Sequence, residues 1–397
     1  MSMRTLKDLG KIVTGNTPKM SERENFDSAD IPFIKPGDIS DDSITVINKG
    51  QFFISENARD KARILPSDSI LVTCIGIIGK VGILTREAAF NQQINGIVPD
   101  INSVIPRYLA YAILSQKSYL QEKANAAVVP IINVPIINKS QFSELKVEVP
   151  NLQKQNEIVR NLDKVDHLIS LQKQQLKGLD ELVKSRFIEM FGDPQSNCYN
   201  WKIVPLKDVM VGGALNGYFT KPQNYDIEGN VGVICVSDVV NRKYTNVNAL
   251  RRAFASEKDL QKYCVKYGDM LFCRSSLVKE GIGKASIIPP HTENDILFEC
   301  HVIKITLDMS RVIPEYLQAL SITDFFRIQV IRQSKTATMT TIGQKDIASV
   351  NILLPPMELQ KRFTEFSAQI DKSKLAVQKS LDELEILKKS LMQQYFG

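Results

Sequence analysis

The residues best suited to hydrolytic chemistry lie around position 145. Glu144 and Lys146 flank a single leucine, and Asp100 lies upstream, a combination that loosely resembles a nuclease metal site. An acidic residue two positions before a lysine is common by chance. A nuclease that uses Glu144 and Lys146 is therefore kept as a less favoured alternative.

A glycine run at positions 76–82 looks at first like a phosphate-binding loop. Gly76, Gly79 and Gly82 surround Lys80, but a Walker loop requires Ser or Thr directly after the lysine, and this chain has Val81 there. The run also lacks the GxG of a dinucleotide-binding fingerprint. It is better explained as a tight turn that lets strands or DNA approach closely.

Histidine and cysteine are too dispersed to form a catalytic or metal-binding pattern. The three histidines are His167, His291 and His301, and the six cysteines contain no CxxC pair. No Ser-His-Asp or Cys-His arrangement can be drawn from the sequence, and the two Pro-Pro dipeptides lack the context of an amino-methyltransferase. We therefore expect a chain without catalytic residues, with reduced cysteines and with no metal or cofactor of its own.

Polar and basic side chains collect instead in loops at matching places of the two halves. Lys and Arg are mixed there with Ser, Thr and Tyr, a combination that contacts DNA phosphates, while amides suit adenine edges and an arginine suits guanine. An ordinary polar loop would explain any single residue equally well, but the match between halves favours DNA binding. The candidate DNA-binding residues are Thr17, Lys19, Lys35, Asp38, Thr73, Lys80, Asn91, Gln92, Gln93, Tyr218, Lys221, Ser237, Asp238, Arg274, Ser275, Ser276, Lys279, Lys284, Glu299, His301, Lys335, Thr336 and Thr338.

The matching halves form an internal repeat of domain size. The segments VEVPNLQKQ and ILLPPMELQ align so that Pro150 matches Pro355 and Gln155 matches Gln360, an offset of 205 (355 − 150 = 205). Upstream, IPFIKPGDIS corresponds to VGVICVSDVV, PSDSILVTCIG to YGDMLFCRSS, and AFNQQINGI to LFECHVIKI. The chain is therefore a duplicated unit of one globular domain and one long helix.

Each repeat ends in a predicted long helix, over about 152–190 and about 357–395. Nearly 40 residues of helix span ~60 Å, and one apolar stripe of that length requires a partner helix, so we expect an antiparallel coiled coil. The first stripe consists of Ile158, Leu162, Val165, Ile169, Leu176, Leu179, Val183 and Met190, with Gln172 and Arg186 as polar members. The second consists of Phe363, Phe366, Ile370, Val377, Leu381, Leu384, Leu387 and Leu391.

The fold class is mixed α/β (α+β), with short apolar strands between turn signals and a helix predicted from about Pro106 to Lys123. We expect globular domains at residues 1–150 and 193–355, and spacer helices at 151–192 and 356–397. The composition is that of a globular protein, with 43% hydrophobic and 24% charged residues. The net charge of +6 permits a polyanionic partner, and a signal peptide and membrane span are not evident, so we expect a cytoplasmic location.

The order of these motifs resembles the specificity subunit of type I restriction-modification enzymes. The resemblance rests on TGNTP near the start, the GDI and SDV strands, the SDSILVTxxGxxGKVG hairpin, the VxVPxLxxQ segment before a long helix, and FGDP between the repeats. It covers essentially the whole chain. The second half departs from it, because its hairpin is expanded to CRSSLVKEGIGKASI and FNQQ becomes FECH.

The resemblance implies two target-recognition domains, each reading one half of a split site on double-stranded DNA. The helices would set the separation of the domains and dock two methyltransferase subunits, with restriction or translocase subunits as further partners. S-adenosylmethionine, ATP and Mg would be bound by those partners. The main alternative is a scaffold in which the helix pair joins two protein-binding domains.

Overall fold

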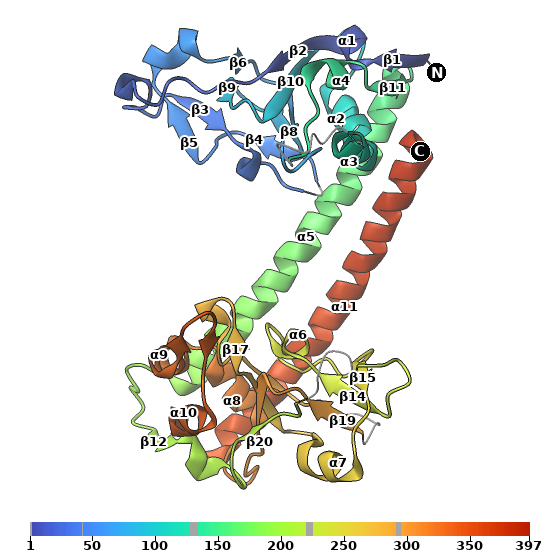
Figure 1. Ribbon diagram of the computed structural model, residues 1–397. Helices are drawn as coiled ribbons and strands as arrows, with labels where there is room; N and C mark the ends of the chain where they lie inside the picture. The colour runs from blue at the N-terminus through green and yellow to red at the C-terminus, as the bar shows by residue number, and fades with distance from the viewer. Residues whose placement is uncertain (1, 42, 127–133, 220–224, 291–294) are drawn as a thin grey trace. The chain divides into compact units, whose positions relative to one another are not determined.

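The computed structural model describes residues 2–41, 43–126, 134–219, 225–290 and 295–397. The chain divides into two units. The first unit contains residues 1–174 and 378–397, and the second contains residues 175–377. Each long helix therefore contributes to both units (Figure 1).

The described residues of the first unit form two main sheets and four short α-helices besides the long helix. Its five-stranded sheet has the order β2-β10-β7-β8-β4, its four-stranded sheet the order β5-β3-β9-β6, and β1 pairs with β11. The strands are β1 Ser2–Thr5, β2 Gly10–Thr14, β3 Ile31–Ile34, β4 Thr45–Ile47, β5 Phe52–Ile54, β6 Ile64–Leu65, β7 Ile70–Thr73, β8 Val81–Leu84, β9 Ala88–Phe90, β10 Ile94–Pro99 and β11 Lys146–Val149. The helices are α1 Leu6–Leu9, α2 Pro106–Ser115, α3 Lys117–Ala126, α4 Lys139–Ser143 and the long α5 Leu152–Phe191.

The second unit repeats this plan. Strands β13-β20-β16-β18 correspond to β2-β10-β7-β8, and β15-β14-β19 correspond to β5-β3-β9. The strands are β12 Lys202–Pro205, β13 Leu215–Asn216, β14 Val231–Ile234, β15 Arg251–Ala253, β16 Met270–Cys273, β17 Ser275–Ser276, β18 Ala285–Ile287, β19 Ile296–Phe298, β20 Val302–Ile305, β21 Lys335–Thr336, β22 Thr340–Thr341 and β23 Asn351–Leu354. The helices are α6 Val236–Val239, α7 Glu257–Tyr263, α8 Pro314–Ser321, α9 Asp324–Gln333, α10 Gln344–Ser349 and the long α11 Met357–Phe396.

The main sheet of each unit is buried on both faces. In β7, Ile70 and Val72 join the core beneath α2, while Leu71 packs into the core between the two sheets. In β16, Phe272 and Leu271 divide in the same way between two cores. Alternate side chains of a strand point to opposite faces, so a continuous apolar run is what such a central strand requires.

The proline and the glutamine five positions later, which recur in both halves, have a structural explanation. Gln155 is fully buried; its Oε1 accepts from Ile105 N at 2.8 Å, and its Nε2 donates to Pro150 O at 2.8 Å. Gln360 repeats the arrangement, accepting from Ile313 N at 2.9 Å and donating to Pro355 O at 2.9 Å. Each glutamine thus ties the first turn of α2 or α8 to the start of the long helix.

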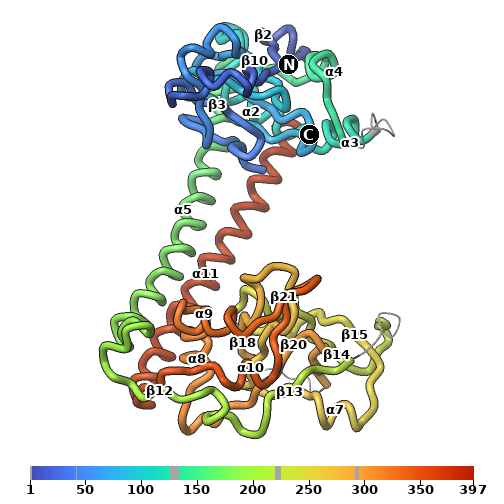
Figure 2. Tube along the Cα trace, turned by 60° about the vertical axis from the view of Figure 1, so that its left-hand side comes forward, coloured from blue at the N-terminus to red at the C-terminus, as the bar shows by residue number. Residues whose placement is uncertain are grey.

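The two long helices pack antiparallel within each unit. In the first unit, Asn161 of α5 contacts Tyr395 of α11, and Gln172 contacts Ser380. In the second unit, Phe187 of α5 packs against Phe363 of α11 with ring centroids 5.5 Å apart. Both units therefore confirm the predicted antiparallel coiled coil (Figures 1 and 2).

Two sequence predictions about helices were wrong in detail. The helix expected over 106–123 is divided at Gln116 into α2 and α3, and the Gln116 side chain donates to Lys146 O at 2.7 Å. Leu387, placed in the apolar stripe, is 46% exposed. Lys388 takes the inward position and pairs with Asp166 of α5 at 2.7 Å, because a straight helix drifts relative to a seven-residue repeat.

Candidate nucleic-acid interface

Four segments lie next to one another at one end of the sheet strands in each unit. They are the first loop (residues 15–19 and 217–219), the acidic turn (35–38 and 235–238), the hairpin tip (74–79 and 274–283), and the turn between the last two sheet strands (91–93 and 299–301). The sequence placed most of its DNA-contact candidates in these segments.

Main-chain hydrogen bonds hold the segments together in the first unit. Asn16 N donates to Phe90 O at 3.0 Å, Asn91 N donates to Ile34 O at 3.1 Å, and Cys74 N donates to Gln93 O at 2.8 Å. These bonds depend on the backbone rather than on side-chain identity. The first loop, the acidic turn and the hairpin tip are therefore all tied to residues 90–93.

The second unit repeats the same bonds with different side chains. Tyr218 N donates to Phe298 O at 2.7 Å, Glu299 N donates to Ile234 O at 2.9 Å, and Arg274 N donates to His301 O at 2.8 Å. Asn16, Cys74 and Gln93 in the first unit thus correspond to Tyr218, Arg274 and His301 in the second. The expected correspondence of FNQQ with FECH is confirmed at the level of backbone register.

The two acidic turns are built by their aspartates. Asp38 Oδ2 accepts from Lys35 N at 2.8 Å, and its Oδ1 accepts from Gln51 N at 3.0 Å. Asp238 Oδ2 accepts from Cys235 N at 2.9 Å in the corresponding turn. Both carboxylates are engaged with backbone donors, so in this structure they shape the turn instead of offering a free group to a ligand.

Several other candidates are buried and bonded within the protein. Thr73 Oγ1 accepts from Lys80 N at 3.0 Å, and Lys80 Nζ lies 3.4 Å from Asp41 Oδ2. Asn91 is 7% exposed, and its Nδ2 donates to Gln93 Oε1 at 2.9 Å. The structure gives Thr73, Lys80 and Asn91 positioning roles beside the exposed surface.

The accessible candidates of the first unit lie on the first loop and the neighbouring turn. Thr17 Oγ1 donates to the exposed Gln92 at 2.8 Å. Lys19 has a side chain 81% exposed and lies 3.7 Å from Glu22. Lys35 Nζ sits 3.3 Å from the centroid of the Phe52 ring. A cation, an amide and hydroxyls are therefore presented together.

The second unit brings two basic loops side by side through a small extra sheet with the order β17-β22-β21. Ser276 pairs with Thr340, and Thr340 also pairs with Thr336. The CRSSLVK and IRQSKTATMTT loops are thereby joined, although the paired residues Ser276 and Thr340 are 64 positions apart in the sequence (340 − 276 = 64). Within these loops Lys279, Lys335, Thr336 and Thr338 are exposed, while Ser275 is buried.

Other candidates of the second unit are partly engaged. Arg274 Nη1 donates to Cys300 O at 2.9 Å, and Lys284 Nζ bonds Asn241 Oδ1. Ser237 and His301 are exposed. Lys221 lies outside the described residues. Arg274 is therefore held beside the exposed His301.

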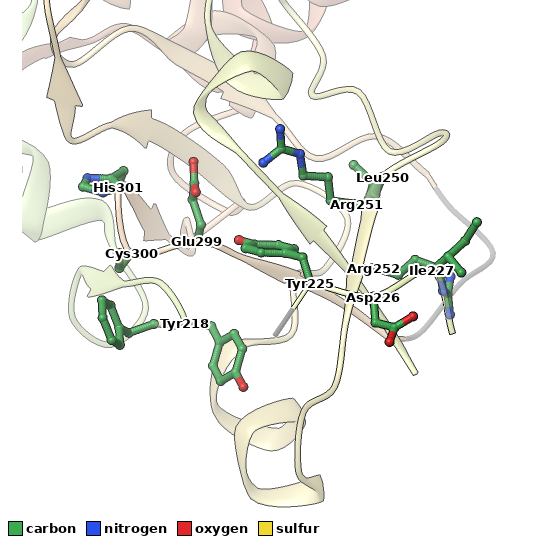
Figure 3. A pocket seen from close by; sticks show the side chains of 11 residues that line it. Tyr218, Tyr225, Asp226, Ile227, Leu250, Arg251, Arg252, Glu299, Cys300 and His301 are labelled. Atoms are coloured by element: carbon green, nitrogen blue, oxygen red, sulfur yellow. The ribbon is translucent and has the colours of Figure 1, made fainter. Parts of the chain in front are cut away.

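A cleft of about 700 Å³ opens beside this surface in the second unit (Figure 3). Glu299 Oε1 accepts from Val236 N at 2.7 Å on one side of it. The Arg251 guanidinium lies 5.9 Å from the Tyr225 ring centroid, and burial raises the pKa of the Tyr225 hydroxyl. The cleft is lined by Tyr218, Phe219, Tyr225, Asp226, Ile227, Leu250, Arg251, Arg252, Glu299, Cys300 and His301.

The sequence candidates omitted the two arginines of this cleft. Arg251 and Arg252 are adjacent, exposed and placed on β15, where Arg252 Nε donates to Gly229 O at 2.8 Å. Adjacent arginines near aromatic residues are a signal for phosphate contacts that the sequence does contain. Phe219, 71% exposed beside Tyr218, was also missed.

The nuclease alternative finds no geometric support. Glu144 Oε1 accepts from Lys7 Nζ at 2.6 Å, and Asp100 accepts from Ser103 Oγ at 2.7 Å, so the two carboxylates serve separate local contacts. In the described part of the chain, no group of three or more His, Cys, Asp or Glu side chains is placed to hold a metal ion. Among the same residues, no helix is both long and apolar enough to cross a membrane.

Comparisons with known proteins identify the relatives of this chain. Residues 1–181 match the family model described as the type I restriction modification DNA specificity domain. The MjaIX specificity subunit of Methanocaldococcus jannaschii is 23% identical over 91% of this chain and 84% of its own length. The EcoKI specificity subunit of Escherichia coli K12 is 21% identical over 97% of this chain and 86% of its own length. The HindI specificity subunit of Haemophilus influenzae is 32% identical over an alignment that covers 38% of this chain and 32% of the HindI subunit.

Solved structures show the same fold. The type I restriction-modification S subunit from M. genitalium matches with a TM-score of 0.54 at 12% identity, covering 100% of this chain and 96% of that one. A chain from a study of complex assembly in the type I R-M system matches with a TM-score of 0.56 at 15% identity, covering 100% and 97%. The resemblance stated from the sequence is confirmed: this chain is related to the specificity subunits of type I restriction-modification enzymes.

Proposed function

We propose that this chain reads a bipartite DNA sequence for a type I restriction-modification complex, with each globular domain recognising one half of the site. The observation that carries the proposal is the repeated interface. The same backbone bonds present four segments in both units, while the side chains beside them differ, as the half-buried Gln93 and the exposed His301 do. Two scaffolds of one design with different surfaces are suited to reading two different half-sites.

The chemistry of the exposed side chains fits duplex DNA. Lysines, arginines and hydroxyls bind phosphates and fix register, while amides and histidine reach base edges. The net charge of +6 and the exposed cations of both units favour a polyanion. Domains at residues 1–150 and 193–355 would each carry one such surface.

The helix pair would space the domains and dock two methyltransferase subunits. Related clefts occur at one place in each unit. Lys184, Phe187 and Ile188 line a cleft of about 460 Å³ in the second unit. Lys389, Met392 and Gln393, each 205 positions later, line one of about 1000 Å³ in the first unit. Two equivalent clefts support two equivalent docking positions.

The relatives are named specificity subunits of type I restriction enzymes, and we expect this chain likewise to be a non-catalytic subunit. Methyl transfer from S-adenosylmethionine, and ATP- and Mg-dependent cleavage, would belong to partner chains. Such a complex would act in the cytoplasm.

Methylation mapping tests this proposal. Host DNA is sequenced for modified bases with and without the gene for this chain, in cells that retain the methyltransferase. A split motif that is methylated only when the chain is present is the expected result. Methylation that is unchanged by removal of the chain would refute a specificity role.

Binding measurements separate the alternatives. The full-length chain is expected to bind duplex DNA with an affinity that falls as salt rises, because phosphate contacts release counterions. A scaffold would show no such binding. Metal-dependent nicking that is lost in Glu144→Gln but kept in the neighbouring Glu148→Gln would instead establish the nuclease alternative.

A further inference from the structure

The hairpin tip of the second unit carries two exposed aliphatic side chains. Leu277 is 85% exposed and Val278 is 60% exposed, directly after the short strand β17. The first unit repeats the feature with Ile77, which is 53% exposed between Gly76 and Gly79. Single exposed apolar residues are ordinary on protein surfaces. Their recurrence at the same point of both units calls for a ligand.

The second tip is firmly built. Ser276 lies in β17, which pairs with β22, and its Oγ accepts from Val278 N at 3.2 Å. Gly281 N donates to Val278 O at 3.0 Å, and a Cβ at Gly281 would lie 2.3 Å from Ser276 Oγ. Ile282, fully buried, anchors the returning chain. The exposure of Leu277 therefore follows from the construction of the tip.

The surroundings of the tip are polar, with one exposed carboxylate, Glu280, among exposed lysines and hydroxyls. Lys279 follows the two aliphatic residues and is exposed, and Lys335, Thr336 and Thr338 are exposed on the strand and turn joined to the tip through β22. An apolar point with a rim of lysines and hydroxyls matches a DNA groove, where phosphates flank the base edges. In the major groove the C5-methyl of thymine is the apolar group that a base edge offers.

We infer that Leu277, together with Val278, contacts the methyl group of a thymine in the second half-site and helps determine its sequence. The inference rests on the proposed function and adds to it a residue and a base. Neither side chain was among the candidates drawn from the sequence, because aliphatic residues in a loop give no signal of base recognition.

A thymine-to-deoxyuridine scan tests this contact. Once the site is mapped, each thymine of the second half-site is replaced singly by deoxyuridine, which removes only the methyl group. Binding of the full-length chain is measured by fluorescence anisotropy. One replacement is expected to weaken wild-type binding about fourfold, the equivalent of burying one carbon group worth about 0.8 kcal/mol. The Leu277→Ala variant or the Val278→Ala variant should bind the thymine duplex and the corresponding deoxyuridine duplex with equal affinity.

Val211→Ala is the matched control. Val211 is 58% exposed, and its N donates to Thr306 O at 2.8 Å, beyond the end of β20 opposite to the tip. This variant should keep the fourfold preference for thymine. Circular dichroism should give the same melting curve for all three variants, because the substituted side chains are exposed.

The contact is overturned if no thymine replacement is coupled to Leu277 or Val278, if the alanine variants lose affinity equally on all duplexes, or if the second half-site contains no thymine. The proposed function fails separately, when the wild-type chain does not prefer its mapped site over a scrambled duplex.

Discussion

Replacing Gln360 with alanine is expected to destabilise the second unit by about 2–4 kcal/mol. Gln360 is fully buried and engages Ile313 N, Pro355 O and, at 3.2 Å, Arg311 O. Removal of the amide leaves the Ile313 N–H buried without its acceptor, which costs about 1–3 kcal/mol, and the truncated side chain adds a cavity.

Fluorescence of Trp201 reports this change selectively. Trp201 is the only tryptophan of the chain, belongs to the second unit, and its Nε1 donates to Phe191 O at 2.9 Å. Urea unfolding followed by its emission should show a lower midpoint for Gln360→Ala. Gln360→Met keeps most of the volume but none of the hydrogen bonds, so it should retain a loss of about 1–3 kcal/mol.

Two matched variants sharpen the result. Gln369→Ala, on the exposed side of α11, should leave the midpoint unchanged within about 0.5 kcal/mol. Gln155→Ala removes the equivalent amide from the first unit and should shift the Trp201 transition much less. A Gln360→Ala variant as stable as wild type would refute the reasoning, and an equal shift from Gln155→Ala would show that the two units unfold as one.

Three further predictions concern recognition, spacing and thiol chemistry. Gln93→Ala should reduce base discrimination only in the first half-site, and His301→Ala only in the second. Each change should reduce discrimination at one base pair by about tenfold to a hundredfold if the lost contact is bidentate. Methylation of randomised duplexes measures this, and an equal loss of discrimination in both half-sites would contradict independent reading by the two domains. Insertion of one heptad after Lys173 and another after Leu384 lengthens each helix by ~10 Å. The DNA spacer between the two preferred half-sites should therefore grow by roughly three base pairs, as methylation mapping would show. An unchanged spacer would mean that the helices dock partner subunits but do not set the spacing. Burial raises the pKa of the Cys74 thiol to about 12 and of the Cys273 thiol to about 11. At pH 8 both thiols stay protonated and should resist iodoacetamide, while the exposed Cys198 is alkylated. Peptide mass mapping that finds all three cysteines labelled at the same rate would disprove this prediction.

Sequence patterns predicted the repeat, the fold class and the helix pair because those features depend on local periodicity. The buried glutamines could be found in the same way, since their motif recurs at a fixed offset. The division of the predicted 106–123 helix at Gln116 was not predictable, because it accompanies a contact with Lys146, a residue distant in sequence. Leu387 was misplaced because a heptad template ignores the slow drift of a straight helix.

The interface was predictable as a set of loops but not residue by residue. Asp38 and Asp238 look like free acidic groups in the sequence, and only the folded turn shows that backbone donors occupy them. Arg251 lines the cleft from strand β15, and this segment was not among the loops selected from the sequence. Which polar side chains face outward depends on strand register, and register is fixed by contacts between distant segments.

The backbone bonds that assemble each interface also bear on how such a chain can evolve. Phe90 O, Ile34 O and Cys74 N belong to the main chain, so these anchors survive when the side chains beside them change. The two halves already show this freedom, since glutamine at 93 stands where histidine stands at 301. Substitutions at the exposed positions therefore carry little risk to folding. One duplicated scaffold can accumulate new sequence preferences in either half without relinquishing the old one in the other.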